Sequence, residues 1–189
     1  MVVLLLALVL ASCAQSSAST FAGAVLHQPY HVPDTKLTDT SGRPASLIGS
    51  DKRLTLIFFG YTHCPDECPT TMATLASAML QLDDADRAAV QVEFVTTDPA
   101  RDTGPVIRTW LDKFDPHFTG LTGPLPTILK VARQVGVPVE KAKKLPSGGY
   151  DITHGTQVLG MDGSHSVPVV WTLGTTAPEF AHDIHQLLS

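Results

Sequence analysis

Residues 54–70 read LTLIFFGYTHCPDECPT, a stretch in which a buried strand gives way to a helix. The run Leu54–Phe59 does not alternate polar and apolar residues, which indicates a strand covered on both faces at the centre of an α/β sheet. Proline has no N–H group and fits a helix only in its first turn, so Pro69 predicts that a helix begins within about three residues before it. The junction therefore carries two thiols, Cys64 and Cys68, where the strand ends and the helix starts.

Two cysteines at such a junction have three possible uses: a structural disulfide, attack on another disulfide, or capture of a soft metal ion. A bridge between residues 64 and 68 would close a very small loop and stabilise the fold little, which disfavours the structural use. The N-terminus of a helix favours a thiolate at Cys68, whereas the carboxylates of Asp66 and Glu67 oppose it unless a cation is bound.

Strand and helix patterns alternate on both sides of this stretch. A hairpin is expected from two short segments, 35–39 and 45–48, around the turn 40–43. Helices are predicted over 69–83, 104–114, 125–136 and from Ala177 to the end, and strands over 90–96, 158–161 and 168–173. This order predicts a three-layer α/β domain with a central mixed sheet and an N-terminal hairpin extension.

The overall composition is that of one ordinary globular domain. The chain has 189 residues, of which 43% are hydrophobic and 16% are charged. The net charge of −5 leaves no basic stripe for a phosphate backbone, so nucleic acid is not expected as a partner.

The first residues resemble an export signal. Val2–Leu10 is apolar but too short to span a bilayer, and Leu10-Ala11-Ser12-Cys13 is similar to a bacterial lipobox. We expect a signal peptide over residues 1–12, lipidation of Cys13, a tether over 13–29 and a folded domain over 30–189. The domain would then lie at the extracytoplasmic face of a bacterial membrane, held by its lipid anchor.

Several motifs together resemble those of the Sco/SenC family, copper-binding proteins of cytochrome c oxidase assembly with a thioredoxin-like fold. They are Phe58–Thr70, Thr97–Thr103, Phe118–Gly123, Thr153–Gly155 and Gly174–Thr176, within a similarity that covers residues 30–188. The resemblance implies a loop at Phe118–Gly123. The resemblance implies a copper site made by Cys64, Cys68 and His154. Thiolates suit Cu(I), and an added imidazole makes a site that also holds Cu(II).

Asp98, Arg101 and Asp102 follow the predicted strand 90–96 and open toward the same end of the sheet as the thiols. They would either orient a group of the site or form a docking surface for a partner. The alternative is a helix cap with a surface ion pair.

Three functions follow from these residues. The first is copper delivery, in which the chain would receive copper from a donor and pass it to an apo-cuproenzyme; the resemblance implies that the recipient is a subunit of cytochrome c oxidase. The second makes the chain an enzyme, a thiol-disulfide oxidoreductase in which Cys64 and Cys68 form a redox-active disulfide and are renewed by a thiol reductant. Thioredoxins use a C-x-x-C pair and a cis-proline beside the thiols. Here the spacing is the wider C-x-x-x-C and residues 151–160 contain no proline, which favours metal handling over thiol-disulfide exchange. A zinc enzyme with two cysteines and one histidine is the third.

Overall fold

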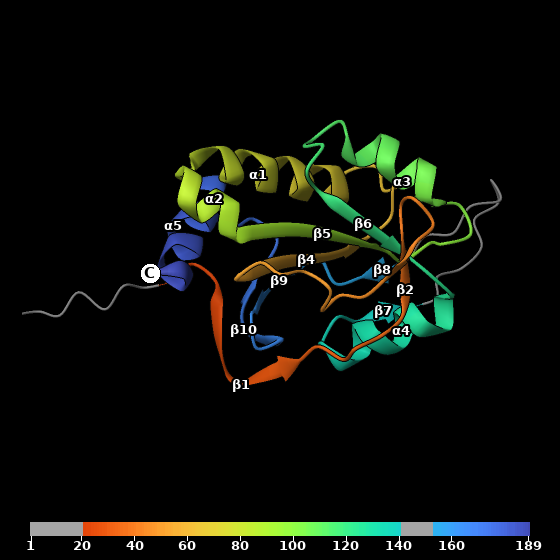
Figure 1. The fold of residues 1–189 in the computed structure, drawn as a ribbon, viewed down its shortest axis with the longest axis horizontal. Coiled ribbons are helices and arrows are strands. Elements are labelled where there is room, and N and C mark those ends of the chain that lie inside the picture. Colours follow the sequence, from red (N-terminus) through yellow and green to blue (C-terminus); the bar gives the residue numbers. More distant parts are fainter. Residues whose placement is uncertain (1–20, 141–152) are drawn as a thin grey trace, which may run out of the picture.

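An eight-stranded mixed sheet forms the middle layer of the molecule, with the strand order β1-β10-β9-β4-β5-β6-β2-β3 (Figure 1). The computed structural model describes residues 21–140 and 153–189. The strands of this sheet are β1 (Ala24–His31), β2 (Leu37–Asp39), β3 (Pro44–Ala45), β4 (Leu54–Gly60), β5 (Val90–Thr96), β6 (Thr119–Thr122), β9 (Val158–Asp162) and β10 (Ser166–Trp171). Two further strands, β7 (Val139–Glu140) and β8 (Thr153–His154), pair separately.

The central strand is β4, and all seven of its residues are buried. It pairs in parallel with β5 and antiparallel with β9, so Phe58 lies opposite both Phe94 and Val158. Because β4, β5 and β6 are parallel neighbours, their carboxyl ends meet at one edge of the sheet. The predicted strand, with both faces covered, is confirmed.

Helices cover both faces of the sheet, which confirms the three-layer α/β architecture. The helices α1 (Glu67–Gln81), α2 (Asp84–Ala89), α3 (Gly104–Leu111), α4 (Leu125–Gln134) and α5 (Ala177–Leu188) are labelled in Figure 1. Met72 of α1 and Trp110 of α3 pack with Phe94 in one hydrophobic cluster. Val131 of α4 packs with Phe59 in a second cluster on the opposite face.

The predicted hairpin is present as β2 and β3, which pair with each other, and β2 continues the sheet beside β6. Thr119–Thr122 was expected to be a loop, and that expectation is wrong, because β6 occupies these residues. The residue Gly120 is needed there, because a Cβ would collide with Ile107 of α3. The short helix α2 was not expected either.

The sheet also begins earlier than expected. β1 starts at Ala24 and pairs with β10, so residues 24–29, expected in the tether, belong to the edge of the sheet. The predicted signal peptide, Cys13 and the first part of the tether lie outside the described residues. Within the described ranges, no helix combines the length and the apolar character needed to cross a bilayer.

Candidate metal centre

One cysteine lies in the loop before α1, and the other lies in the first turn of this helix. β4 ends at Gly60, the loop 61–66 follows, and α1 begins at Glu67, so Cys68 is its second residue, as predicted from the proline. The backbone N–H of Cys68 donates a hydrogen bond to Sγ of Cys64 over 3.4 Å. Gly60 is required by this packing, because a Cβ there would lie 3.0 Å from Sγ of Cys68.

The two thiols differ sharply in exposure. Cys68 is fully buried, whereas Cys64 is half-buried. Burial raises the pKa of the Cys68 thiol far above its usual range, and the negative charges of Cys64 and Glu67 raise it further. The prediction of a favoured thiolate at Cys68 is therefore wrong, because burial of the sulfur disfavours its charged form. The sulfur that accepts the helical N–H is that of Cys64.

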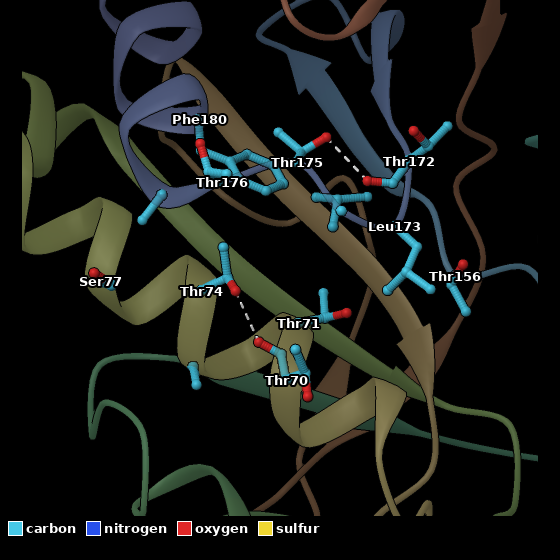
Figure 2. A pocket seen from close by; sticks show the side chains of 14 residues that line it. Thr70, Thr71, Thr74, Ser77, Thr156, Thr172, Leu173, Thr175, Thr176 and Phe180 are labelled. Atoms are coloured by element: carbon cyan, nitrogen blue, oxygen red, sulfur yellow. Dashed lines mark hydrogen bonds between the residues drawn. The ribbon is translucent and has the colours of Figure 1, made fainter.

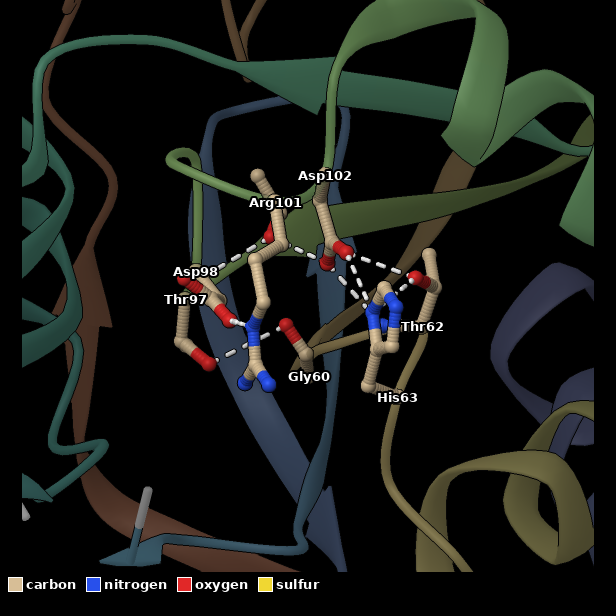
Figure 3. A network of polar contacts seen from close by, with 8 residues as sticks. Gly60, Thr62, His63, Thr97, Asp98, Arg101 and Asp102 are labelled. Carbon is tan, nitrogen blue, oxygen red and sulfur yellow. Dashed lines mark hydrogen bonds and ion pairs between the residues drawn. The ribbon is translucent and has the colours of Figure 1, made fainter. Parts of the chain in front are cut away.

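Asp102 ties the loop that carries Cys64 to the end of β5 (Figure 3). Its fully buried carboxylate accepts hydrogen bonds from the N–H of Thr62 over 2.9 Å, from the Thr62 hydroxyl over 2.6 Å and from the Thr96 hydroxyl over 2.7 Å. Nδ1 of His63 lies 3.5 Å from the same carboxylate. The backbone just before Cys64 is thus fixed by a side chain from the next loop along the sheet edge.

Asp98 and Arg101 extend this network. The N–H of Asp98 donates to the Thr96 hydroxyl over 2.9 Å, and the Arg101 guanidinium pairs with the Asp98 carboxylate. The N–H of Thr97 donates to the carbonyl of Gly60 over 2.6 Å. The structure therefore brings all three predicted residues, Asp98, Arg101 and Asp102, to the sheet edge from which the dithiol loop departs.

Sequence reasoning missed Thr62 and Thr96, the hydroxyl partners of Asp102. Each lies at or just beyond the end of a central strand, at the edge where the aspartates were expected. A hydroxyl residue in that position was the signal that could have identified them.

The backbone of His154 lies in β8, where it pairs with Val139 of β7, and the N–H of the next residue, Gly155, donates to the carbonyl of Pro138. The chain then enters β9 at Val158, opposite Phe58 near the carboxyl end of β4. Thr156 lines a groove together with Thr70 and Thr71 of α1. The segment after His154 therefore passes beside the first turn of the helix that carries Cys68.

The described part of this site offers two neighbouring sulfur atoms, which suit a soft metal ion. Metal binding would remove the protons of both thiols and place a positive charge beside the buried Cys68 sulfur. That charge compensates for the desolvation that otherwise keeps Cys68 protonated. The same pair is also suited to forming and breaking a disulfide.

Comparison with known proteins gives consistent results. A model of the SCO1/SenC family matches residues 26–189. A putative copper-binding protein of Stutzerimonas stutzeri is 33% identical over 135 residues, which cover 70% of this chain and 66% of that protein. The matched segments span between 40% and 66% of the first curated relatives' own length.

Two solved structures resemble the fold closely. The apo Sco1 protein of Thermus thermophilus has a TM-score of 0.80 and 30% identity, covering 90% of this chain and 99% of that chain. The copper-bound ScoI of Bradyrhizobium japonicum has a TM-score of 0.71 and 33% identity, covering 85% of this chain and 98% of that chain. With a family match over most of its length and the same fold as the Thermus protein, the chain belongs to the SCO1/SenC family.

Proposed function

We propose that this chain binds copper through Cys64, Cys68 and His154 and delivers it to an apo-cuproenzyme outside the cytoplasm, the copper centre of a cytochrome c oxidase subunit. The observation that carries the proposal is the contact between the Cys68 N–H and Sγ of Cys64, which holds the loop cysteine next to the first turn of α1. Membership in the family and the copper bound by the Bradyrhizobium relative support copper as the cargo.

In this proposal copper is the substrate of a ligand-exchange reaction. Two thiolates hold Cu(I), and the imidazole of His154 completes a site for Cu(II). A thiolate of the acceptor joins the copper as Cys64, the more exposed ligand, dissociates and takes up a proton. Cys68, which is buried, is then the last ligand to leave. Oxidation of the pair to a disulfide removes both sulfur ligands and prevents loading.

Asp102 has a positioning role in this proposal, with Asp98 and Arg101 supporting it. The buried carboxylate holds the backbone of Thr62, two residues before Cys64. A fixed loop would keep the two sulfur atoms close enough for one metal ion to bind both. In metal sites generally, residues that contact the ligands orient them in this way.

A second function, thiol-disulfide exchange, is favoured by the unequal exposure of the two cysteines. Cys64 is the accessible thiol that would attack a target disulfide, release one target thiol and leave a mixed disulfide. Cys68 would then attack Cys64, which releases the second target thiol and leaves the chain's own disulfide. This two-electron reduction requires an external thiol reductant to renew the pair.

We also propose that a lipid on Cys13 holds the domain at the extracytoplasmic face of the membrane, after removal of residues 1–12. The tether would then end where β1 begins at Ala24. Labelling of cells with radioactive palmitate tests this proposal: wild-type protein should carry the label in the membrane fraction. A Cys13→Ala variant that still carries the label would contradict it.

Titration of the reduced full-length protein in detergent with Cu(I), against a competing chelator, tests the leading function. Cys64→Ser and Cys68→Ser should each lower the affinity by more than about 100-fold, beyond the typical effect of residues that only support ligands. His154→Ala should weaken Cu(II) more than Cu(I). The matched control is His27→Ala, an exposed histidine on β1.

Wild-type affinity in either cysteine variant would contradict the copper site. Reduction of glutathione disulfide is measured in parallel, because it separates the two functions. Rapid turnover that survives His154→Ala, combined with weak copper binding, would favour the oxidoreductase.

A further inference from the structure

A groove of about 600 Å³ lies between α1, the start of β9 and the connection from β10 to α5 (Figure 2). Thr70, Thr74 and Ser77 line it from α1, and residues 172–176 line it from the opposite side. Val158 and Phe180, which are both buried, also line it. Neither face of this groove takes part in the copper chemistry described above.

The groove begins beside the candidate metal centre. Thr71, which follows Cys68 by three residues and therefore lies on the same side of α1, lines the groove, and Thr156, which follows His154 by two residues, lines it as well. A polypeptide segment lying in the groove would therefore end next to the dithiol, where an acceptor ligand must arrive to take copper from Cys64.

No charged side chain lines this groove among the described residues, although 16% of the whole chain is charged. The hydroxyl protons of Thr74 and Thr175 are donated to the backbone carbonyls of Thr70 and Thr172, both over 2.9 Å. Their oxygen atoms therefore offer hydrogen-bond acceptors to an occupant. Leu173 adds an apolar surface that is 50% exposed.

These properties select the chemistry of the occupant. A charged side chain in the groove would lose water without gaining an opposite charge, which is unfavourable. An uncharged extended segment would donate its backbone N–H groups to the threonine oxygens and place an apolar side chain against Leu173. The stretch from Thr70 to Ser77 covers about 10 Å of helix axis, which matches about three residues of extended chain.

We propose that the groove binds an extended, uncharged segment of the apo-cuproenzyme that adjoins its copper-binding residues. This inference rests on the proposed copper delivery and names the surface that recognises the acceptor. Docking converts ligand exchange between two proteins into a reaction within one complex, which raises the effective concentration of the acceptor thiolates at Cys64.

Stopped-flow copper transfer tests the proposal, with Cu(I)-loaded full-length protein in detergent and the apo form of the soluble copper domain of the oxidase as the probe. Ser77→Arg introduces a charge at an exposed position of the groove. We expect the second-order transfer rate to fall about tenfold, with the Cu(I) affinity within twofold of wild type. Ala73→Arg, a second exposed groove position, should behave in the same way.

The matched control is Gln81→Arg, which adds the same charge to an exposed position of α1 outside the groove. It should transfer copper at the wild-type rate. Equal rates in all variants, or equal losses in the groove and control variants, would overturn the docking proposal. A loss of Cu(I) affinity in the groove variants would also overturn it, because the groove would then belong to the metal site.

A second measurement uses metal-free protein. Amide resonances of Ser77, Thr156 and Leu173 should shift when the apo domain is added, and the absence of shifts there would contradict the proposal. Failure of copper delivery itself has a different signature. In that case the wild-type protein does not bind or transfer copper, whereas failure of docking leaves the wild type active and Ser77→Arg equally active.

Discussion

The carboxylate of Asp102 shows how one buried residue organises the loop before Cys64. We predict that Asp102→Asn lowers the Cu(I) affinity about tenfold, within the range typical of residues that orient metal ligands. The amide replaces one acceptor oxygen with an NH₂ donor, which would face the N–H and hydroxyl donors of Thr62 and Thr96. Affinity is measured by competition with a Cu(I) chelator.

The matched control for this variant is Asp112→Asn, which changes a half-exposed carboxylate paired with Arg108 at the end of α3. It should keep the wild-type affinity. If Asp102→Asn binds copper as tightly as this control, Asp102 only stabilises the fold and does not position the dithiol.

The sequence predicted the identities of these site residues better than their environments. Cys64, Cys68 and Asp102 were identifiable because proline and strand ends locate them along the chain. The relative burial of the two thiols was not, because it depends on packing of Cys68 against residues such as Gly60. A local argument about the helix N-terminus therefore predicted a favoured thiolate at Cys68, where burial in fact raises the pKa of the thiol.

Glu93 is a carboxyl group in the interior of β5, 6% exposed, and its Oε2 has no hydrogen-bond partner within the described residues. Burial raises its pKa from 4.5 to about 8. The folded chain therefore holds a proton that the unfolded chain releases, so the contribution of Glu93 to stability is fully present below pH 4.5 and is lost as the pH rises through about 8. The loss is on the order of 5 kcal/mol, since the pKa rises from 4.5 to about 8 and each pKa unit corresponds to about 1.4 kcal/mol.

We predict that Glu93→Gln removes most of this pH dependence and makes the protein more stable than wild type at pH 8. Urea denaturation at pH 5 and pH 8 measures the effect. Asp51→Asn, at an exposed position, is the control and should leave the pH dependence of the unfolding free energy unchanged. If Glu93→Gln keeps the pH dependence of wild type, Glu93 is ionised at neutral pH in the folded protein.

At the scale of elements, α2 is joined to α5 by a contact between Asp86 and His185, whose Oδ2 and Nδ1 atoms lie 2.6 Å apart. This hydrogen bond raises the pKa of His185 above 6.5. The stabilisation it gives is therefore fully present below pH 6.5 and is lost as the pH rises through the raised value.

We predict that His185→Gln reduces the difference in thermal midpoint between pH 6 and pH 9. The comparison is made in the Glu93→Gln background, because Glu93 also titrates in this interval. His182→Gln, on the same helix, serves as the control. A pH dependence that is identical in both histidine variants would exclude the contribution of the α2–α5 contact.

The predicted elements are determined largely by the pattern of their own residues, whereas the missed elements depend on pairing with strands that are distant along the chain. β4 and α1 carry long apolar patterns that determine their burial. β1 contains Pro29 and is mostly exposed, so it resembles a poor strand, and only its pairing with β10 makes it one. β6 is the short sequence TGLT, held between β5 and β2 by contacts that are distant along the chain.

Across the whole molecule, Asp183 connects the two ends of the described chain. Its buried carboxylate accepts hydrogen bonds from the N–H of Gly23 and from Nε1 of Trp171, both over 2.8 Å, and from the N–H of Ala22 over 3.2 Å. Figure 1 shows that β1 begins beside α5, whereas the start of α1 lies toward the other side of the molecule. The point where a tether would enter the domain is therefore separate from the dithiol.

We predict that Asp183→Ala lowers the free energy of unfolding by about 3 kcal/mol, because buried donors lose their acceptor at a cost of about 1–3 kcal/mol each. Amide hydrogen exchange in β1 should become faster, since its first residues lose their attachment to α5. The Cu(I) affinity should remain that of wild type. Asp84→Ala, a fully exposed carboxylate on α2, should change neither stability nor exchange. A copper affinity that falls together with the stability of β1 would show instead that the two sides of the molecule are coupled through the sheet.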